Sequence, residues 1–159
     1  MKKQKFNFVI GLIFVVTMIF VTKASALNPL EESKVKELLG NYERVLNASD
    51  VEGILKLYAQ DGVFMPQHSS SQVGTDAIRE AYTHVFEAID LDVVFDIIEV
   101  EIISDQWAFA RTTSSGTTTI NADGTKVPES NQELFLLGKQ TNGEWKIARY
   151  IFSTMNPRQ

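Results

Sequence analysis

The chain has 159 residues, of which 20 are acidic and 15 are basic, and it contains no cysteine. Its formal charge of −5 argues against nucleic acid or an anionic membrane surface as a partner. Without cysteine no disulfide framework can form, and two histidines, His68 and His84, are too few for an ordinary zinc site. We therefore expect a domain that is stabilised by packing alone and binds no metal.

The first 26 residues are typical of a secretory signal peptide. Three early lysines precede an apolar run over residues 6–21, and Ala24-Ser25-Ala26 places small residues at a signal peptidase site. The alternative is an uncleaved anchor, although a run of 16 apolar residues is shorter than the roughly 20 that span a bilayer. Cleavage predicts a secreted or periplasmic domain over residues 27–159, with a formal charge of −9 and no stable membrane association.

Two helices are predicted at the start of this domain. The first begins with Asn28 as N-cap and Pro29 at the first helical position. Its apolar face follows a spacing of three and four residues and comprises Val35, Leu38, Leu39, Tyr42 and Leu46. The second helix begins with a capping box formed by Ser49 and Glu52, and it ends near residues 61–62.

A short strand over residues 63–65 follows, closed by Pro66, which cannot donate a hydrogen bond to a neighbouring strand. A third helix begins after Gly74 and Thr75 and carries a wide apolar stripe.

From Leu91 onward the apolar period changes to two, which indicates strands. The alternation slips at Ile97-Ile98 and predicts a β-bulge there. Further strands are predicted over residues 107–120, 129–139 and 144–154, separated by turns at residues 121–124 and 141–143. The order α-α-β-α-β-β-β-β predicts an α+β domain in which helices cover one side of a curved antiparallel sheet.

Three segments, "LYAQDGVFM", "GTDAIREAY" and "NGEWKIARYIFS", resemble the nuclear transport factor 2-like superfamily and, within it, the SnoaL-like group with its ketosteroid isomerase and polyketide cyclase relatives. The resemblance covers residues 30–156. It implies a cone in which three helices close a cavity on the concave face of the sheet, and a homodimer formed through the outer face. Because enzymes, binding modules and assembly domains share this fold, the resemblance does not fix the activity.

The isomerase residues carry over only in part. Tyr42 lies eight residues before Asp50, which is the spacing of the isomerase tyrosine, and it could present a phenol to the cavity. The position of the catalytic base falls on Met65 or Pro66, and the position of the late acid falls near Gln132. Neither position holds a carboxylic acid, so steroid isomerisation by that mechanism is not expected.

Other residues could supply the missing chemistry. His68 lies near the expected cavity mouth and could act as a base, or it could be an exposed loop residue. Glu133 could serve instead if it points inward, although its strand neighbours suggest that it points outward.

Arg111 could hold a carboxylate or a polarised carbonyl if it shares the concave face with Phe109, Thr113 and Ser115. The alternative is an ordinary edge strand in which the arginine blunts pairing. An apolar pocket, or simply a packed core, could be formed by an aromatic set: Tyr58, Phe64, Tyr82, Phe86, Tyr150 and Phe152. Met65 and Gln132 are further ligand-binding candidates.

Three functions fit these observations. The first is an exported domain whose mainly apolar cavity binds a small organic molecule. The second is a cofactor-free isomerase or cyclase that uses His68 as base and Tyr42 or Arg111 to stabilise an oxyanion. The third is a protein-interaction module whose interior is filled by its own side chains. No glycine-rich phosphate loop, nucleophile elbow or paired-histidine motif is present, so we expect no cofactor.

Overall fold

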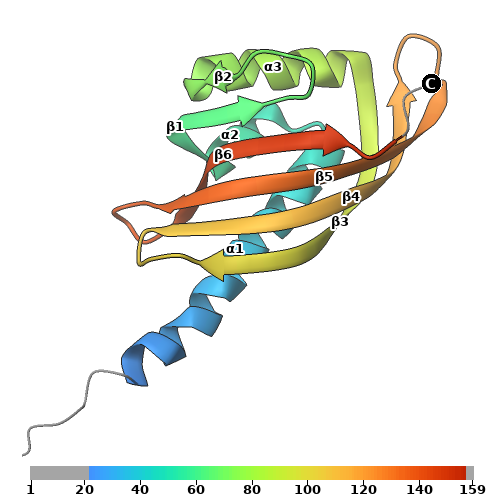
Figure 1. Cartoon of the computed structure of the whole chain (residues 1–159). Helices are drawn as coiled ribbons and strands as arrows, with labels where there is room; N and C mark the ends of the chain where they lie inside the picture. The colour runs from blue at the N-terminus through green and yellow to red at the C-terminus, as the bar shows by residue number, and fades with distance from the viewer. Residues whose placement is uncertain (1–21, 157–159) are drawn as a thin grey trace, which may run out of the picture.

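The computed structural model describes residues 22–156, and three helices lie on one face of a curved six-stranded sheet within this range (Figure 1). The helices are α1 (Thr22–Asn47), α2 (Val51–Leu57) and α3 (Gly74–Ala88). The strands are β1 (Tyr58–Met65), β2 (Gln72–Val73), β3 (Ile89–Ile102), β4 (Trp107–Ile120), β5 (Lys126–Lys139) and β6 (Trp145–Thr154). Their order in the sheet is β2-β1-β6-β5-β4-β3, which confirms the predicted α+β class.

Helix α1 begins at Thr22, upstream of the predicted N-cap Asn28, and contains Pro29. The predicted start is therefore wrong, because this proline removes one backbone hydrogen bond without ending the helix. The predicted apolar face is confirmed, since all five of its residues are buried. The predicted signal segment up to residue 21 lies outside the described residues. No helix among residues 22–156 is both long and apolar enough to cross a membrane.

Two side chains of α1 cover the edge of the sheet at β3. Asn47 donates to the carbonyl of Val93 at 2.7 Å and accepts from the N–H of Val93 at 3.0 Å. Glu43 accepts from the N–H of Phe95 at 2.8 Å. These bonds satisfy backbone groups that an edge strand would otherwise expose, and they hold α1 across the concave face.

Helix α2 is capped by Asp50, whose carboxylate accepts from the N–H of Gly53 at 2.8 Å. The predicted capping box at Ser49 is wrong, because Ser49 has a φ of 52° and the chain enters the helix one residue later. The helix also ends earlier than predicted, at Leu57, since Tyr58 already pairs with β6.

Strand β1 runs parallel to β6, whereas the other neighbouring strands pair antiparallel. The sheet is therefore mixed and not wholly antiparallel as predicted, because no local turn connects β1 with β6 and the sequence carries no signal for this pair. The bulge predicted at Ile97-Ile98 is confirmed by a register shift between Ile97 and Glu99.

A close approach between β3 and β4 requires Gly116. A Cβ atom at this position would clash with the backbone of Asp92 and Val93. The two strands can lie this close only because glycine has no side chain.

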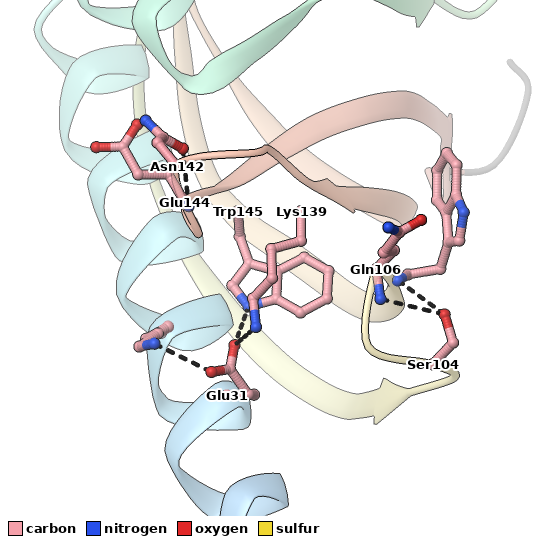
Figure 2. A network of polar contacts seen from close by, with 9 residues as sticks. Glu31, Ser104, Gln106, Lys139, Asn142, Glu144 and Trp145 are labelled. Atoms are coloured by element: carbon pink, nitrogen blue, oxygen red, sulfur yellow. Dashed lines mark hydrogen bonds and ion pairs between the residues drawn. The ribbon is translucent and has the colours of Figure 1, made fainter.

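A polar cluster fastens α1 to the hairpin between β5 and β6 (Figure 2). The carboxylate of Glu31 accepts from Trp145 Nε1 at 2.7 Å and pairs with Lys139 Nζ at 2.6 Å. Lys34 adds an ion pair at 3.0 Å. The hydrogen bond with Lys139, then those with Lys34 and Trp145, lower the pKa of Glu31 from 4.5 to about 2.

Candidate functional site

A cavity of about 180 Å³ lies between the helices and the concave face of the sheet. Aliphatic side chains at the end of α3 and along β3 form one part of its wall: Val85, Ile89, Leu91 and Val93. Aromatic rings form most of the remainder: Tyr42, Phe64, Tyr82, Phe95, Tyr150 and Phe152. The polar lining residues are Ser114, Glu129 and Asn131.

The aromatic wall is built on Phe64 of β1. Its ring stacks on Tyr82 with centroids 4.8 Å apart, on Tyr150 at 5.5 Å and on Phe152 at 6.1 Å. These rings come from α3 and from both strands of the parallel pair, so the β1–β6 pairing assembles the wall. Such a wall suits a flat apolar ligand.

A chain of buried phenols runs from the cavity wall into the core. The hydroxyl of Tyr42 lies 2.6 Å from that of Tyr82, which lies 3.1 Å from that of Tyr58. Burial raises the pKa of all three phenols well above 10.0, so they remain protonated at neutral pH. Tyr42 and Tyr82 line the cavity, and Tyr58 supports them from outside it.

The polar end of the cavity lies where β4 meets β5. Glu129 accepts from Thr118 Oγ1 at 2.8 Å and from Asn131 Nδ2 at 2.7 Å. The side-chain amide oxygen Oδ1 of Asn131 is buried and has no hydrogen-bond partner among the described residues. This end therefore holds one carboxylate and one unsatisfied acceptor.

Glu133 lies beside this polar end and is 3% exposed. Its carboxylate accepts from Thr112 Oγ1 and from Ser114 Oγ, each at 2.5 Å. Burial raises the pKa of Glu133, and the negative charge of Glu129 adds to this effect. The expectation that Glu133 points outward is wrong, because Phe135 and Leu137 are buried on the same face and strand period two brings Glu133 with them.

His68 lies in the exposed loop after β1, with a φ of 62°. It borders an outer hollow, and three residues line both this hollow and the inner cavity: Glu129, Asn131 and Phe152. His68 itself does not line the inner cavity. Its ring nitrogen Nε2 lies 2.8 Å from Gln67 Nε2.

Arg111 lies on the opposite face of the sheet from the helices and forms an ion pair with Glu99 at 3.2 Å. Phe109, Thr113 and Ser115 follow the same alternation as Arg111, so the expectation that these residues share the concave face is wrong. Gln132 also lies on the outer face. The inward residues of β4 are instead Ala108, Ala110, Thr112 and Ser114, which are all buried.

Five of the other predicted site residues line the cavity: Tyr42, Phe64, Tyr82, Tyr150 and Phe152. Phe86 packs against the core, and Met65 at the end of β1 is partly buried, but neither lines this cavity. Their ligand-binding roles stay predictions. Sequence reasoning missed Glu129, Asn131 and Ser114, although counting back in twos from the apolar Phe135 would have placed Glu129 and Asn131 inside.

The comparisons with known proteins agree with this architecture. The pattern of the SnoaL-like domain matches residues 40–137. A comparison with curated proteins finds no match. A ketosteroid isomerase-like protein from Erwinia carotovora atroseptica is 36% identical, with a TM-score of 0.78, and the alignment covers 80% of this chain and 98% of that one.

Two more distant structures share the fold. One is a candidate scytalone dehydratase from Novosphingobium aromaticivorans. It is 15% identical with a TM-score of 0.73, and the alignment covers 83% of this chain and 89% of that one. The other is a protein with a cystatin-like fold from Caulobacter vibrioides, 19% identical with a TM-score of 0.64, aligned over 79% of this chain and 89% of that one. The chain therefore belongs to the SnoaL-like family of the nuclear transport factor 2-like superfamily.

Proposed function

We propose that this protein is an exported binding protein that holds one small organic molecule in the cavity beneath α1 and α3. The observation that carries the proposal is the cavity itself, whose walls are mainly aromatic and aliphatic and whose polar groups gather at one end. Natural ligand sites combine an apolar lining with a few polar groups in this way.

The size of the cavity sets the size of the ligand. A dry apolar cavity of about 150 Å³ accommodates benzene. The volume of about 180 Å³ found here is therefore suited to a single ring with a short substituent. A fused four-ring compound would require the walls to move apart.

Filling the cavity tests the proposal. Val85→Phe adds a ring to the cavity wall, whereas Val94→Phe makes the same change on an outward position that is 66% exposed. We expect the wild type and Val94→Phe to bind benzyl alcohol in calorimetric titrations, and Val85→Phe to lose binding while its circular dichroism is unchanged. Failure of the wild type to bind any single-ring probe, together with an empty protein in native mass spectrometry after purification from the exported compartment, would refute the proposal.

The enzyme alternative finds partial support. A protonated Tyr42 on the cavity wall could stabilise an oxyanion, but Arg111 lies on the other face and His68 lines only the outer hollow. Binding requires only the cavity. The third function, an interaction module with a filled interior, is disfavoured by the cavity.

We also propose that the protein forms a homodimer through the outer face of the sheet. Leu134 and Ile151 are neighbours there and are 46% and 44% exposed. Exposed apolar residues that adjoin one another are typical of association surfaces. Analytical ultracentrifugation should show a dimer for the wild type and a monomer for Leu134→Lys, and a wild-type monomer at micromolar concentration would contradict the proposal.

Export rests on the basic and apolar pattern of the first 26 residues. Cleavage after Ala26 would remove the first five residues of α1. N-terminal sequencing of protein from the culture medium or periplasm should therefore begin at Leu27, and a chain that keeps Met1 would support the anchor alternative.

A further inference from the structure

Within residues 22–156, the carboxylate of Glu129 has hydrogen-bond donors but no ion-pair partner. Thr118 donates to one of its oxygens and Asn131 to the other, which is the pattern that an ionised, acceptor-only carboxylate can accept. Among the described residues, Glu129 takes part in no ion pair. A partly buried charge of this kind is stabilised when a cation approaches it.

The rest of the cavity offers no cationic side chain to an anion. None of its lining residues within the described part of the chain is Lys, Arg or His. The unpartnered oxygen of Asn131 adds a second acceptor at the same end. A bound carboxylate would meet like charge, whereas a bound donor would supply the partner that Asn131 lacks.

The aromatic wall favours the same ligand charge. Phe152 lines the cavity together with Glu129 and Asn131, and the rings of Tyr150 and Phe64 continue from it at centroid distances of 5.9 and 6.1 Å. Ring faces attract organic cations, and they also pack against an apolar body.

Accepting the proposed binding function, we infer that the ligand is a small organic cation: one aromatic or alicyclic ring bearing a protonated amine. The ring lies against Phe64, Tyr150 and Phe152, and the ammonium group faces Glu129 and Asn131. Glu129 sets the specificity for charge, and the aromatic wall sets the specificity for size.

Three probes with the same ring and different charge test this inference. Benzylamine is protonated at pH 7, benzyl alcohol is neutral and benzoate is negative, and each is titrated calorimetrically at low ionic strength. We expect benzylamine to bind about tenfold more tightly than benzyl alcohol, and benzoate to bind most weakly. Glu129→Gln should abolish the preference for benzylamine over benzyl alcohol. The matched control is Glu101→Gln, which neutralises an exposed acid on β3 and should leave the preference intact.

The outcomes separate this inference from the binding function on which it rests. Equal affinities for benzylamine and benzyl alcohol, or a preference for benzoate, would overturn the cation inference while leaving a binding cavity. Retention of the preference in Glu129→Gln would overturn the role of Glu129. If no probe binds, both proposals fail. Should Glu129→Gln not fold, the ranking of the three probes by the wild type still decides whether the cavity selects a cation.

Discussion

Replacing Glu31 with glutamine is expected to loosen α1 from the hairpin between β5 and β6, and to do so in a pH-dependent way. The glutamine side chain would keep an oxygen for the indole of Trp145 but would lose the charge that faces Lys139 and Lys34 (Figure 2). The pKa of Glu31 falls from 4.5 to about 2, and each unit corresponds to about 1.36 kcal/mol, which gives an upper bound of about 3.4 kcal/mol. Solvent screening reduces the expected loss to about 1.5 kcal/mol.

The sign of the pH dependence follows from the direction of the shift. A carboxyl group whose pKa is lower in the folded state stabilises the fold fully above about pH 4.5, and this contribution is lost as the pH falls toward 2. Urea unfolding should therefore show a gap of about 1.5 kcal/mol between the wild type and Glu31→Gln at pH 7 that shrinks between pH 4.5 and pH 2.

The matched control for this experiment is Glu32→Gln. Glu32 pairs with Lys36 at 2.6 Å on the helix surface, and its side chain is 39% exposed, so the expected loss is about 0.5 kcal/mol or less. Equal losses for the two variants at pH 7, or a gap for Glu31→Gln that persists to pH 2, would refute the reasoning.

Three further substitutions probe the cavity and its frame. Tyr82→Phe should lower the free energy of unfolding by about 1 kcal/mol more than Tyr58→Phe, because the Tyr82 hydroxyl is the partner of two buried hydroxyls. Equal losses of unfolding free energy for the two variants in urea titrations would contradict the chain of phenols. Gly116→Ala should lower the melting temperature because the added Cβ would clash with the backbone of β3. Gly40→Ala should raise the melting temperature, because its Cβ would contact no other atom and alanine favours the helix at this exposed position. Shifts of the melting temperature in the same direction for both variants, measured by calorimetry, would contradict this packing. The pKa of Glu133 is raised in the fold, so the wild type should lose stability relative to Glu133→Gln as the pH rises and this carboxyl ionises. This pH dependence has the opposite sign to that of Glu31. Parallel pH profiles of stability for the wild type and Glu133→Gln would contradict it.

The features of the fold that depend on short stretches of sequence were predicted correctly. The apolar spacing of α1, the stripe of α3 and the slip at Ile97 depend only on near neighbours, and all three are confirmed. The features that failed depend on partners distant in sequence. Helix α2 ends at Leu57 because Tyr58 pairs with Ile147, and no property of the segment itself announces that pairing.

The register of β4 shows why the site was harder to predict than the fold. Both alternating sets of "WAFARTTSSGTTTI" contain polar residues, so binary patterning does not decide which set points inward. The pairing with β5 decides it, because Ala110 and Thr112 lie opposite the buried Phe135 and Glu133, whereas Arg111 lies opposite the exposed Leu134. The partner strand, and not the segment itself, thus shows which face of β4 is buried.

This single choice of register also reverses the expected charge of the ligand. With Arg111 inside, the cavity would hold a cation and would suit a carboxylate. With Arg111 outside and paired with Glu99, the acids of β5 become the charged groups near the cavity, because Glu129 and Glu133 follow the same period of two as Phe135. A shift of one residue exchanges the two faces of a strand, so the charge of the preferred ligand reports which face of β4 and β5 lines the cavity. The ranking of benzylamine, benzyl alcohol and benzoate therefore probes the register and the specificity together.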